Sequence, residues 1–318
     1  MKIVFLEKET LGEDIDVTPF NQLGEVELYS RGATVKENAD HIADADVLVV
    51  NKIPINEELL CKADNLKLIA ASATGTNNID FEYTSKRGII VSNARDYSTD
   101  SVVQHTFAIL FYLYEKLPVY DRFVKTGDYT RYPMFSCFTP YFHELSGKTW
   151  GIIGLGAIGR QVAKIATAFG CNVIYYSASG NKYDCPYENV SFDKLLESSD
   201  IISIHCPLTP VTNNLIDEAA LKKVKKEAVI LNLARGPIIN ETALADALNQ
   251  GRIAAAGLDV LCVEPMSPDS PFFSVKDKDK LLITPHIGWG TTEARSRCVD
   301  EVYKNIEAFK NGSPRNVC

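Results

Sequence analysis

Three polar residues, Arg235, Asp259 and His286, each follow a short apolar run in the second half of the chain. An arginine presents a planar fork that pairs with a carboxylate through two parallel hydrogen bonds. A histidine can donate a proton near neutral pH, and the carboxylate of Glu264 could hold its ring and favour the charged form. Each residue alone is more often structural than catalytic. Because all three follow strands of one expected sheet, we interpret them together as an anion-binding and proton-transferring site.

A glycine-rich turn lies upstream of these residues. Gly154, Gly156 and Gly159 form a G-x-G-x-x-G motif between an expected strand at residues 149–153 and an expected helix at residues 158–169. The first glycine permits a tight turn, the second lets the backbone approach a pyrophosphate, and the third lets the helix pack on the strand. The helix N-terminus suits an anion. The motif predicts a dinucleotide site; the alternative is a glycine-rich turn without a ligand.

Together the two patterns predict that a ketone is reduced by a nicotinamide cofactor. His286 would supply the proton, and Arg235 would bind a substrate carboxylate and polarise the carbonyl. The choice between NAD and NADP stays open at this point. The acidic residue that commonly accepts hydrogen bonds from the ribose is absent, because Ser177 follows the expected strand. Lys182 could pair with a 2′-phosphate, or it could be a solvated loop lysine.

The elements that must position these residues alternate between β-rich and helical patterns. Strands are expected at residues 2–6, 26–29, 47–50, 67–71, 89–91, 149–153, 172–176, 201–204, 228–231, 254–258 and 281–283. Helices are expected at residues 35–43, 56–62, 80–87, 98–117, 158–169, 192–197, 218–223, 241–249 and 292–309, with Pro118 ending the long one. Short Val/Ile/Leu-rich runs are typical of parallel strands covered on both faces. The alternation therefore predicts an α/β fold with parallel sheets.

Composition narrows the class of partner. The sequence has 318 residues and a net charge of −8, which disfavours nucleic acid and anionic membranes. The eight cysteines are scattered without metal-ligand spacing, so we expect no metal and a cytoplasmic protein with reduced thiols. The longest apolar run, residues 107–114, is far short of the ~20 residues of a membrane span.

These motifs together resemble the D-isomer-specific 2-hydroxyacid dehydrogenase family. The resemblance extends over almost the whole sequence and is carried by residues 154–159, 232–236, 257–260, 264–265 and 284–288. It implies two Rossmann-like domains with parallel sheets. A flavodoxin-like substrate domain would consist of residues 1–97 and 287–318, and an inserted NAD(P)-binding domain would consist of residues 98–286. The active site would lie in the cleft between them.

The resemblance also implies a set of site residues. Arg235, Glu264 and His286 would be the catalytic trio. The cofactor would be bound by Thr106, Gly154, Gly156, Ala157, Ile158, Gly159, Ser177, Cys206, Pro207, Thr212, Leu233, Ala234, Asp259 and Gly288. The substrate would be bound by Asn51, Lys52, Thr74, Gly75, Thr76 and Arg235, although the polarity of Asn51 and Lys52 could be that of any loop. Asn240 stands where many members have aspartate, and we expect it to cap a helix.

Within the family, residues 73–75 and 286–295 look most like glycerate dehydrogenases, also called hydroxypyruvate reductases. The expected substrates are small anionic 2-oxo and 2-hydroxy acids, with hydroxypyruvate and D-glycerate as the leading pair. A dehydrogenase for D-lactate or for branched D-2-hydroxy acids is the alternative, and a nicotinamide-sensing co-regulator is a further one. Since the sequence ends at Cys318, we expect no regulatory C-terminal domain. The resemblance implies a homodimer formed through the inserted domain and an irregular excursion around residues 120–141.

Overall fold

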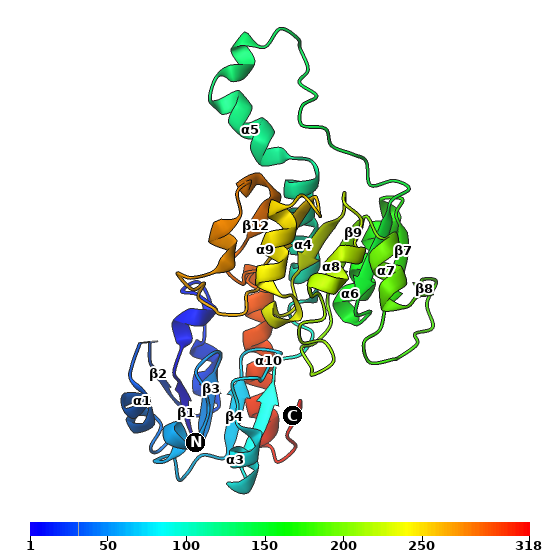
Figure 1. Ribbon diagram of the computed structural model, residues 1–318. Coiled ribbons are helices and arrows are strands. Elements are labelled where there is room, and N and C mark those ends of the chain that lie inside the picture. The colour runs from blue at the N-terminus through cyan, green and yellow to red at the C-terminus, as the bar shows by residue number, and fades with distance from the viewer. Residues whose placement is uncertain (31) are drawn as a thin grey trace. The chain divides into compact units, whose positions relative to one another are not determined.

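The computed structural model describes residues 1–30 and 32–318. The protein consists of two compact units, here called the first and second units. The first unit contains Met1–Ser98 and Trp289–Cys318, and the second contains Thr99–Gly288 (Figure 1). Each unit has its own parallel sheet with helices on its faces, so the expected α/β class is confirmed.

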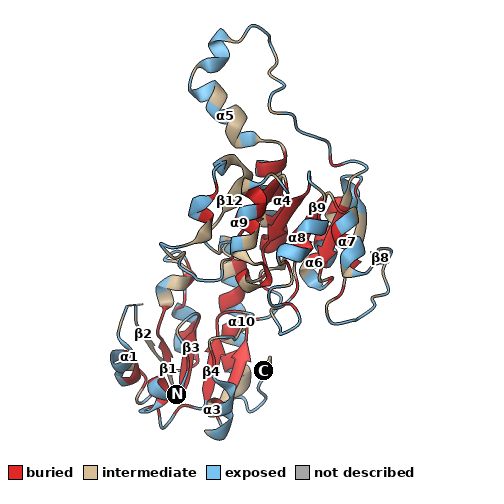
Figure 2. Cartoon of the chain, viewed as in Figure 1, coloured by how far each residue is buried: buried red, intermediate tan, exposed pale blue. Residues whose placement is uncertain are grey.

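The first unit has a five-stranded sheet in the order β2-β1-β3-β4-β5, with every pair parallel. The strands are β1 (Lys2–Phe5), β2 (Glu25–Leu28), β3 (Val47–Val50), β4 (Leu68–Ala71) and β5 (Ile90–Asn93). The helices are α1 (Val35–His41), α2 (Glu57–Leu60), α3 (Phe81–Lys86) and α10 (Thr292–Lys310). Side chains of β1 alternate between two buried clusters, one of which includes Val302 and Ile306 of α10. Both faces of this sheet are therefore covered, as its apolar strands require (Figure 2).

The second unit has a seven-stranded sheet in the order β12-β11-β10-β9-β6-β7-β8, again with every pair parallel. The strands are β6 (Thr149–Ile153), β7 (Asn172–Tyr176), β8 (Glu188–Asn189), β9 (Ile201–Ile204), β10 (Val229–Asn232), β11 (Ala255–Leu258) and β12 (Leu281–Ile283). The helices of its body are α4 (Thr99–Tyr114), α6 (Ala157–Ala168), α7 (Phe192–Ser198), α8 (Glu218–Lys223) and α9 (Glu241–Asn249). The strand order reverses between β6 and β9, and the carboxyl ends of strands at such a switch point form the usual ligand crevice of open α/β sheets.

One segment departs from the expected helix at residues 98–117. Helix α4 ends at Tyr114, and a separate helix α5 (Leu117–Lys125) follows after Lys116, whose φ is 57°. Pro118 lies in the first turn of α5, where its missing N–H has no helical partner to lose, so it begins a helix rather than only ending one. Figure 1 shows α5 projecting from the body of the second unit and returning through an extended stretch.

The remaining helical segments are short 3-10 turns at Lys8–Leu11, Thr18–Gln22, Asp128–Arg131, Gly236–Ile238, Pro271–Ser274 and Lys278–Lys280. Within residues 1–30 and 32–318, no helix combines the length and the hydropathy needed to cross a bilayer.

Candidate active site

The glycine turn joins β6 to α6 at the switch point of the second unit. Gly154 has a φ of +95°, and a Cβ there would lie 2.7 Å from the backbone nitrogen of Cys206. A Cβ on Gly159 would lie 2.2 Å from the Gly154 carbonyl oxygen. Gly156, by contrast, faces open space, and no side chain caps the first turn of α6. The turn therefore leaves room and free N–H groups for a pyrophosphate, and it fits a dinucleotide.

Hydroxyl groups of the segment after β7 and a basic side chain of α6 lie beside this turn. The hydroxyl oxygens of Ser177 and Ser179 lie 3.2 Å apart. The guanidinium carbon of Arg160 lies 4.7 Å from the ring centroid of Tyr183, and its Nε donates to the Leu155 carbonyl at 3.2 Å. No acidic side chain stands at position 177 to repel a 2′-phosphate, so this segment does not distinguish NAD from NADP.

The loop after β9 forms the other side of the turn. Cys206 is buried, and burial raises the pKa of its thiol to about 11, which makes it a packing residue rather than a nucleophile. Thr212 donates its hydroxyl to the Pro207 carbonyl at 2.7 Å and so closes this loop. Thr106 of α4 is also buried, and its hydroxyl donates to the Val102 carbonyl of its own helix at 2.8 Å.

His286 and Glu264 form a close pair in the second unit. Nδ1 of His286 lies 2.7 Å from Oε2 of Glu264, and the other carboxylate oxygen accepts the N–H of Leu261 at 2.9 Å. His286 has a φ of 56°, a left-handed conformation that a residue without a glycine's freedom adopts only when its surroundings hold it. Its Nε2 has no hydrogen-bond partner among the described residues. The ring is thus fixed at one nitrogen and can donate a proton from the other.

Asp259 holds the backbone on which His286 lies. Its two carboxylate oxygens accept the N–H groups of Ile287 at 2.9 Å and Gly288 at 2.8 Å. Thr284 donates its hydroxyl to Asp259 at 2.7 Å, and Nε2 of His105 lies 3.3 Å from the same carboxylate. Burial alone would raise the pKa of Asp259, but these hydrogen bonds outweigh it, so its pKa lies below the ordinary value. Asp259 is therefore a buried anion that fixes the loop carrying His286.

His105 and Thr284 also belong to this cluster, although no sequence motif links them to Asp259. Thr284 comes two residues before His286, and His105 stands next to Thr106 on a helix that is otherwise strongly apolar. A polar residue on such a helix was the available signal, but its partner Asp259 lies far along the sequence, on the other side of the glycine turn.

Arg235 follows β10 and is only partly exposed. Its Nη1 donates to the carbonyl of Ala234 at 2.7 Å, and it forms no ion pair with a carboxylate among the described residues. A Cβ on the next residue, Gly236, would lie 2.0 Å from the carbonyl carbon of Leu261, so the backbone passes directly against the loop that holds Glu264. The structure thus brings the Arg235 backbone to the Glu264 loop, and leaves a guanidinium available for an anion.

The expected substrate residues of the first unit lie on two loops after β3 and β4. Thr74 is exposed, and its hydroxyl donates to the Ala94 carbonyl at 3.0 Å, while the N–H groups of residues 74–76 donate to no group in the described part of the protein. Asn51 is buried and donates its amide to the Thr10 hydroxyl at 3.1 Å, whereas Lys52 is exposed. Of the two polar residues after β3, only Lys52 therefore presents its side chain to solvent.

A parallel sheet that carries a glycine turn at its switch point, and a histidine–carboxylate pair after another of its strands, defines the class of nicotinamide-dependent dehydrogenases. A family model for the "D-isomer specific 2-hydroxyacid dehydrogenase, NAD binding domain" matches residues 107–288. The chain therefore belongs to the D-isomer-specific 2-hydroxyacid dehydrogenases, NAD(P)-dependent enzymes that act on a CH–OH group, and the resemblance of its motifs is confirmed.

Full-length relatives agree with this assignment. A hydroxypyruvate reductase of Blautia hydrogenotrophica is 39% identical, over 100% of this chain and 99% of the relative. A glycerate dehydrogenase of Methylorubrum extorquens is 36% identical, over 99% of this chain and 98% of the relative. Among solved structures, a D-lactate dehydrogenase of Aquifex aeolicus complexed with NAD and lactic acid has a TM-score of 0.83 at 30% identity, and the match covers 98% of this chain and 96% of that one.

Proposed function

We propose that the protein reduces hydroxypyruvate to D-glycerate, and catalyses the reverse oxidation, with NADH or NADPH. The observation that carries this proposal is the His286–Glu264 pair, held at 2.7 Å with the other ring nitrogen open. The two full-length relatives named for hydroxypyruvate and glycerate support the choice of substrate.

In this proposal the bound nicotinamide ring supplies the hydride to C2, and the protein supplies everything else. His286 donates its Nε2 proton to the carbonyl oxygen as the alcohol forms, while Glu264 keeps the ring oriented and balances its charge. Arg235 binds the carboxylate of the substrate and polarises the carbonyl group next to it. The open N–H groups of Thr74, Gly75 and Thr76 donate hydrogen bonds to the substrate carboxylate, and the ammonium of Lys52 contributes a positive charge to the same loops.

The same proposal assigns the cofactor to the switch point of the second unit. Its pyrophosphate would bind the glycine turn at residues 154–159, and its adenosine would lie between Ser177 and the loop at residues 206–212. Residues 233–234, Asp259 and Gly288 would lie toward the nicotinamide end. Either NAD or NADP fits. Ser177 binds the ribose of NAD less tightly than an aspartate or glutamate would, but it does not repel the 2′-phosphate of NADP.

An absorbance assay at the nicotinamide band tests the reaction directly. We expect turnover with hydroxypyruvate above that with glyoxylate, pyruvate or 2-oxoisocaproate, each tried with NADH and NADPH. The neighbour complexed with lactic acid makes pyruvate the second candidate, and preference for pyruvate would replace the first. Turnover with none of these acids would refute the proposal.

Substitution of the proton donor tests the mechanism. His286→Gln should lower turnover by about 10²–10⁴-fold, the usual contribution of a positioned acid, while cofactor affinity measured by fluorescence stays near the wild-type value. His143→Gln removes an exposed histidine of the same unit and serves as the matched control. Unchanged turnover in His286→Gln would exclude this residue as the acid.

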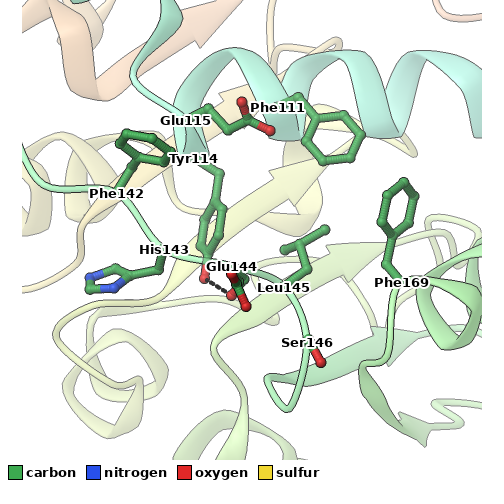
Figure 3. A pocket seen from close by; sticks show the side chains of 9 residues that line it. All are labelled: Phe111, Tyr114, Glu115, Phe142, His143, Glu144, Leu145, Ser146 and Phe169. Carbon is green, nitrogen blue, oxygen red and sulfur yellow. Dashed lines mark hydrogen bonds between the residues drawn. The ribbon is translucent and has the colours of Figure 1, made fainter. Parts of the chain in front are cut away.

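We also propose a cytoplasmic homodimer. Phe135 is 91% exposed, and Phe138 and Tyr141 of the same extended stretch are exposed as well, which is unusual for a surface in water. Near the base of this stretch, Phe111, Phe169 and their neighbours line a hollow of about 550 Å³ (Figure 3). A second copy of the protein would cover this apolar surface. All eight cysteines are free thiols, as a reducing compartment allows.

Light scattering tests the homodimer and should report twice the mass of one polypeptide. Phe135→Ser with Phe138→Ser should shift the protein toward the monomer, because these two rings are exposed without a second copy. A monomeric wild type would refute this part of the proposal.

A further inference from the structure

Glu7 is a buried carboxylate that none of the roles described above uses. It follows β1 at the carboxyl edge of the first sheet and is only 3% exposed. Its Oε2 accepts the N–H groups of three consecutive residues, Asn51 at 3.0 Å, Lys52 at 2.7 Å and Ile53 at 2.8 Å. Successive backbone N–H groups that converge in this way form an anion-binding concavity. The protein therefore fills its own anion site with Glu7.

Burying the Glu7 carboxylate in this way lowers the stability of the folded protein, which suggests that the charge has a function. The second carboxylate oxygen, Oε1, is sealed from solvent and has no hydrogen-bond partner among the described residues. Burial of a charge is unfavourable, and a half-satisfied carboxylate is a poor way to stabilise a turn. What the carboxylate does achieve is to fix the direction of residues 51–53, and with it the point from which the exposed side chain of Lys52 leaves the backbone.

The loop after β4 is tied to the same clamp. Asn78 donates its side-chain amide to the Ile53 carbonyl at 2.8 Å, and its own carbonyl accepts the N–H of Ile55 at 2.7 Å. Asn78 closes the loop whose N–H groups at residues 74–76 donate to no described group. Glu7 therefore fixes residues 51–53, and the hydrogen bonds of Asn78 connect residues 53–55 to the loop that carries the open N–H groups.

The two loops also differ in the hydrogen-bond donors that they offer to an anion. After β3 the N–H groups of residues 51–53 already donate to an internal carboxylate, whereas after β4 those of residues 74–76 donate to no described group. An incoming carboxylate would therefore find its hydrogen-bond donors at residues 74–76 and not at residues 51–53, where the N–H groups already donate to Glu7.

We propose that Glu7 is a positioning residue that directs the carboxylate of the substrate to residues 74–76 and holds Lys52 toward it. This inference rests on the proposed function of these loops. It predicts that loss of the Glu7 charge weakens substrate binding more than it slows the chemical step, because Glu7 does not touch the reacting atoms.

The kinetic test compares Glu7→Gln with Glu27→Gln. Glu27 is a carboxylate of the same sheet that pairs with Lys2 at 2.8 Å and lies on the edge strand β2. We expect Glu7→Gln to raise KM for hydroxypyruvate about tenfold or more, the equivalent of one charge-assisted hydrogen bond, with kcat within about twofold and cofactor affinity unchanged. Glu27→Gln should leave KM unchanged. Glu7→Asp keeps the charge at a shorter reach and should give an intermediate KM, which also serves if Glu7→Gln does not fold. A lower melting temperature with unchanged KM would overturn the proposal.

Amide hydrogen exchange tests the clamp without substrate. In Glu7→Gln, or in Glu7→Asp if that variant alone folds, exchange should accelerate at residues 51–53 and also at residues 76–79, since Asn78 links the two loops. Faster exchange confined to residues 51–53 would refute the transmission to the second loop. If wild-type protein fails to reduce any 2-oxo acid, the proposed function is wrong, yet this exchange pattern still tests the clamp by itself.

Discussion

Lowering the pH should destabilise the second unit through one residue, His205. This histidine follows β9, and both of its ring nitrogens are buried without hydrogen-bond partners among the described residues, although part of the residue surface is open. Burial disfavours the charged ring and lowers the pKa of His205 from 6.5 to about 3. Below pH 6.5 the unfolded state therefore binds a proton that the folded state does not bind. Stability is lost as the pH falls from about 6.5 toward 3, and at pH 5 the loss is about 2 kcal/mol.

The assay is urea unfolding at pH 7 and pH 5, followed by the fluorescence of Trp150. Trp150 lies fully buried on β6 beside β9, and a Trp289→Phe background removes the signal of the first unit. The variant His205→Phe cannot titrate, so its stability should fall less between the two pH values than that of wild type, by about 2 kcal/mol. It should also be at least as stable at pH 7, because two unpaired buried nitrogens are removed. The exposed control His143→Gln should behave as wild type does. An equal loss in wild type and His205→Phe would refute the reasoning, since carboxylates contribute alike to both.

Two further predictions concern buried contacts of the second unit. Gly154→Ala should lower the free energy of unfolding by about 2 kcal/mol or more and weaken cofactor binding, because a Cβ on this left-handed residue would lie 2.7 Å from the backbone of Cys206. Thermal unfolding measures the first effect and a fluorescence titration the second. A variant equal to wild type in both would contradict the tight turn. The indole N–H of Trp150 donates to the Ser203 hydroxyl at 2.9 Å, its only acceptor among the described residues. Ser203→Ala should therefore lower the free energy of unfolding in urea by about 1–3 kcal/mol. A stability equal to that of wild type would contradict this.

The strands of the second sheet could be predicted closely from the sequence. Residues 149–153, 172–176 and 201–204 were expected and observed with the same bounds, because strands covered on both faces need continuous apolar runs that stand out from their neighbours. Asn240 also caps α9 as expected, accepting the N–H of Ala243 at 3.0 Å. Signals of this kind are local, so a few adjacent residues are enough to read them.

Other elements gave no local signal or a misleading one. Strand β8 is two exposed polar residues, Glu188–Asn189, and exists only because β7 offers it an edge. The sequence does not predict helix α5, because a proline such as Pro118 is equally compatible with the end of one helix and with the first turn of the next. Which of the two occurs depends on Lys116 adopting a left-handed conformation, and no single-residue propensity encodes that.

The acidic balance of the protein is the clearest case in which composition conceals a site. A net charge of −8 suggests a poor binder of anions. Yet Glu7 and Asp259 hold their charge inside the protein, each accepting N–H groups of a loop at the carboxyl edge of its own sheet. A carboxylate that orders such a loop does not repel an anion as an exposed one does, because backbone donors already compensate it. The number of acidic residues therefore says little about the field at a site, and the sequence could not show which carboxylates point inward. That depends on pairing residues far apart in the sequence, for which there is no short-range pattern.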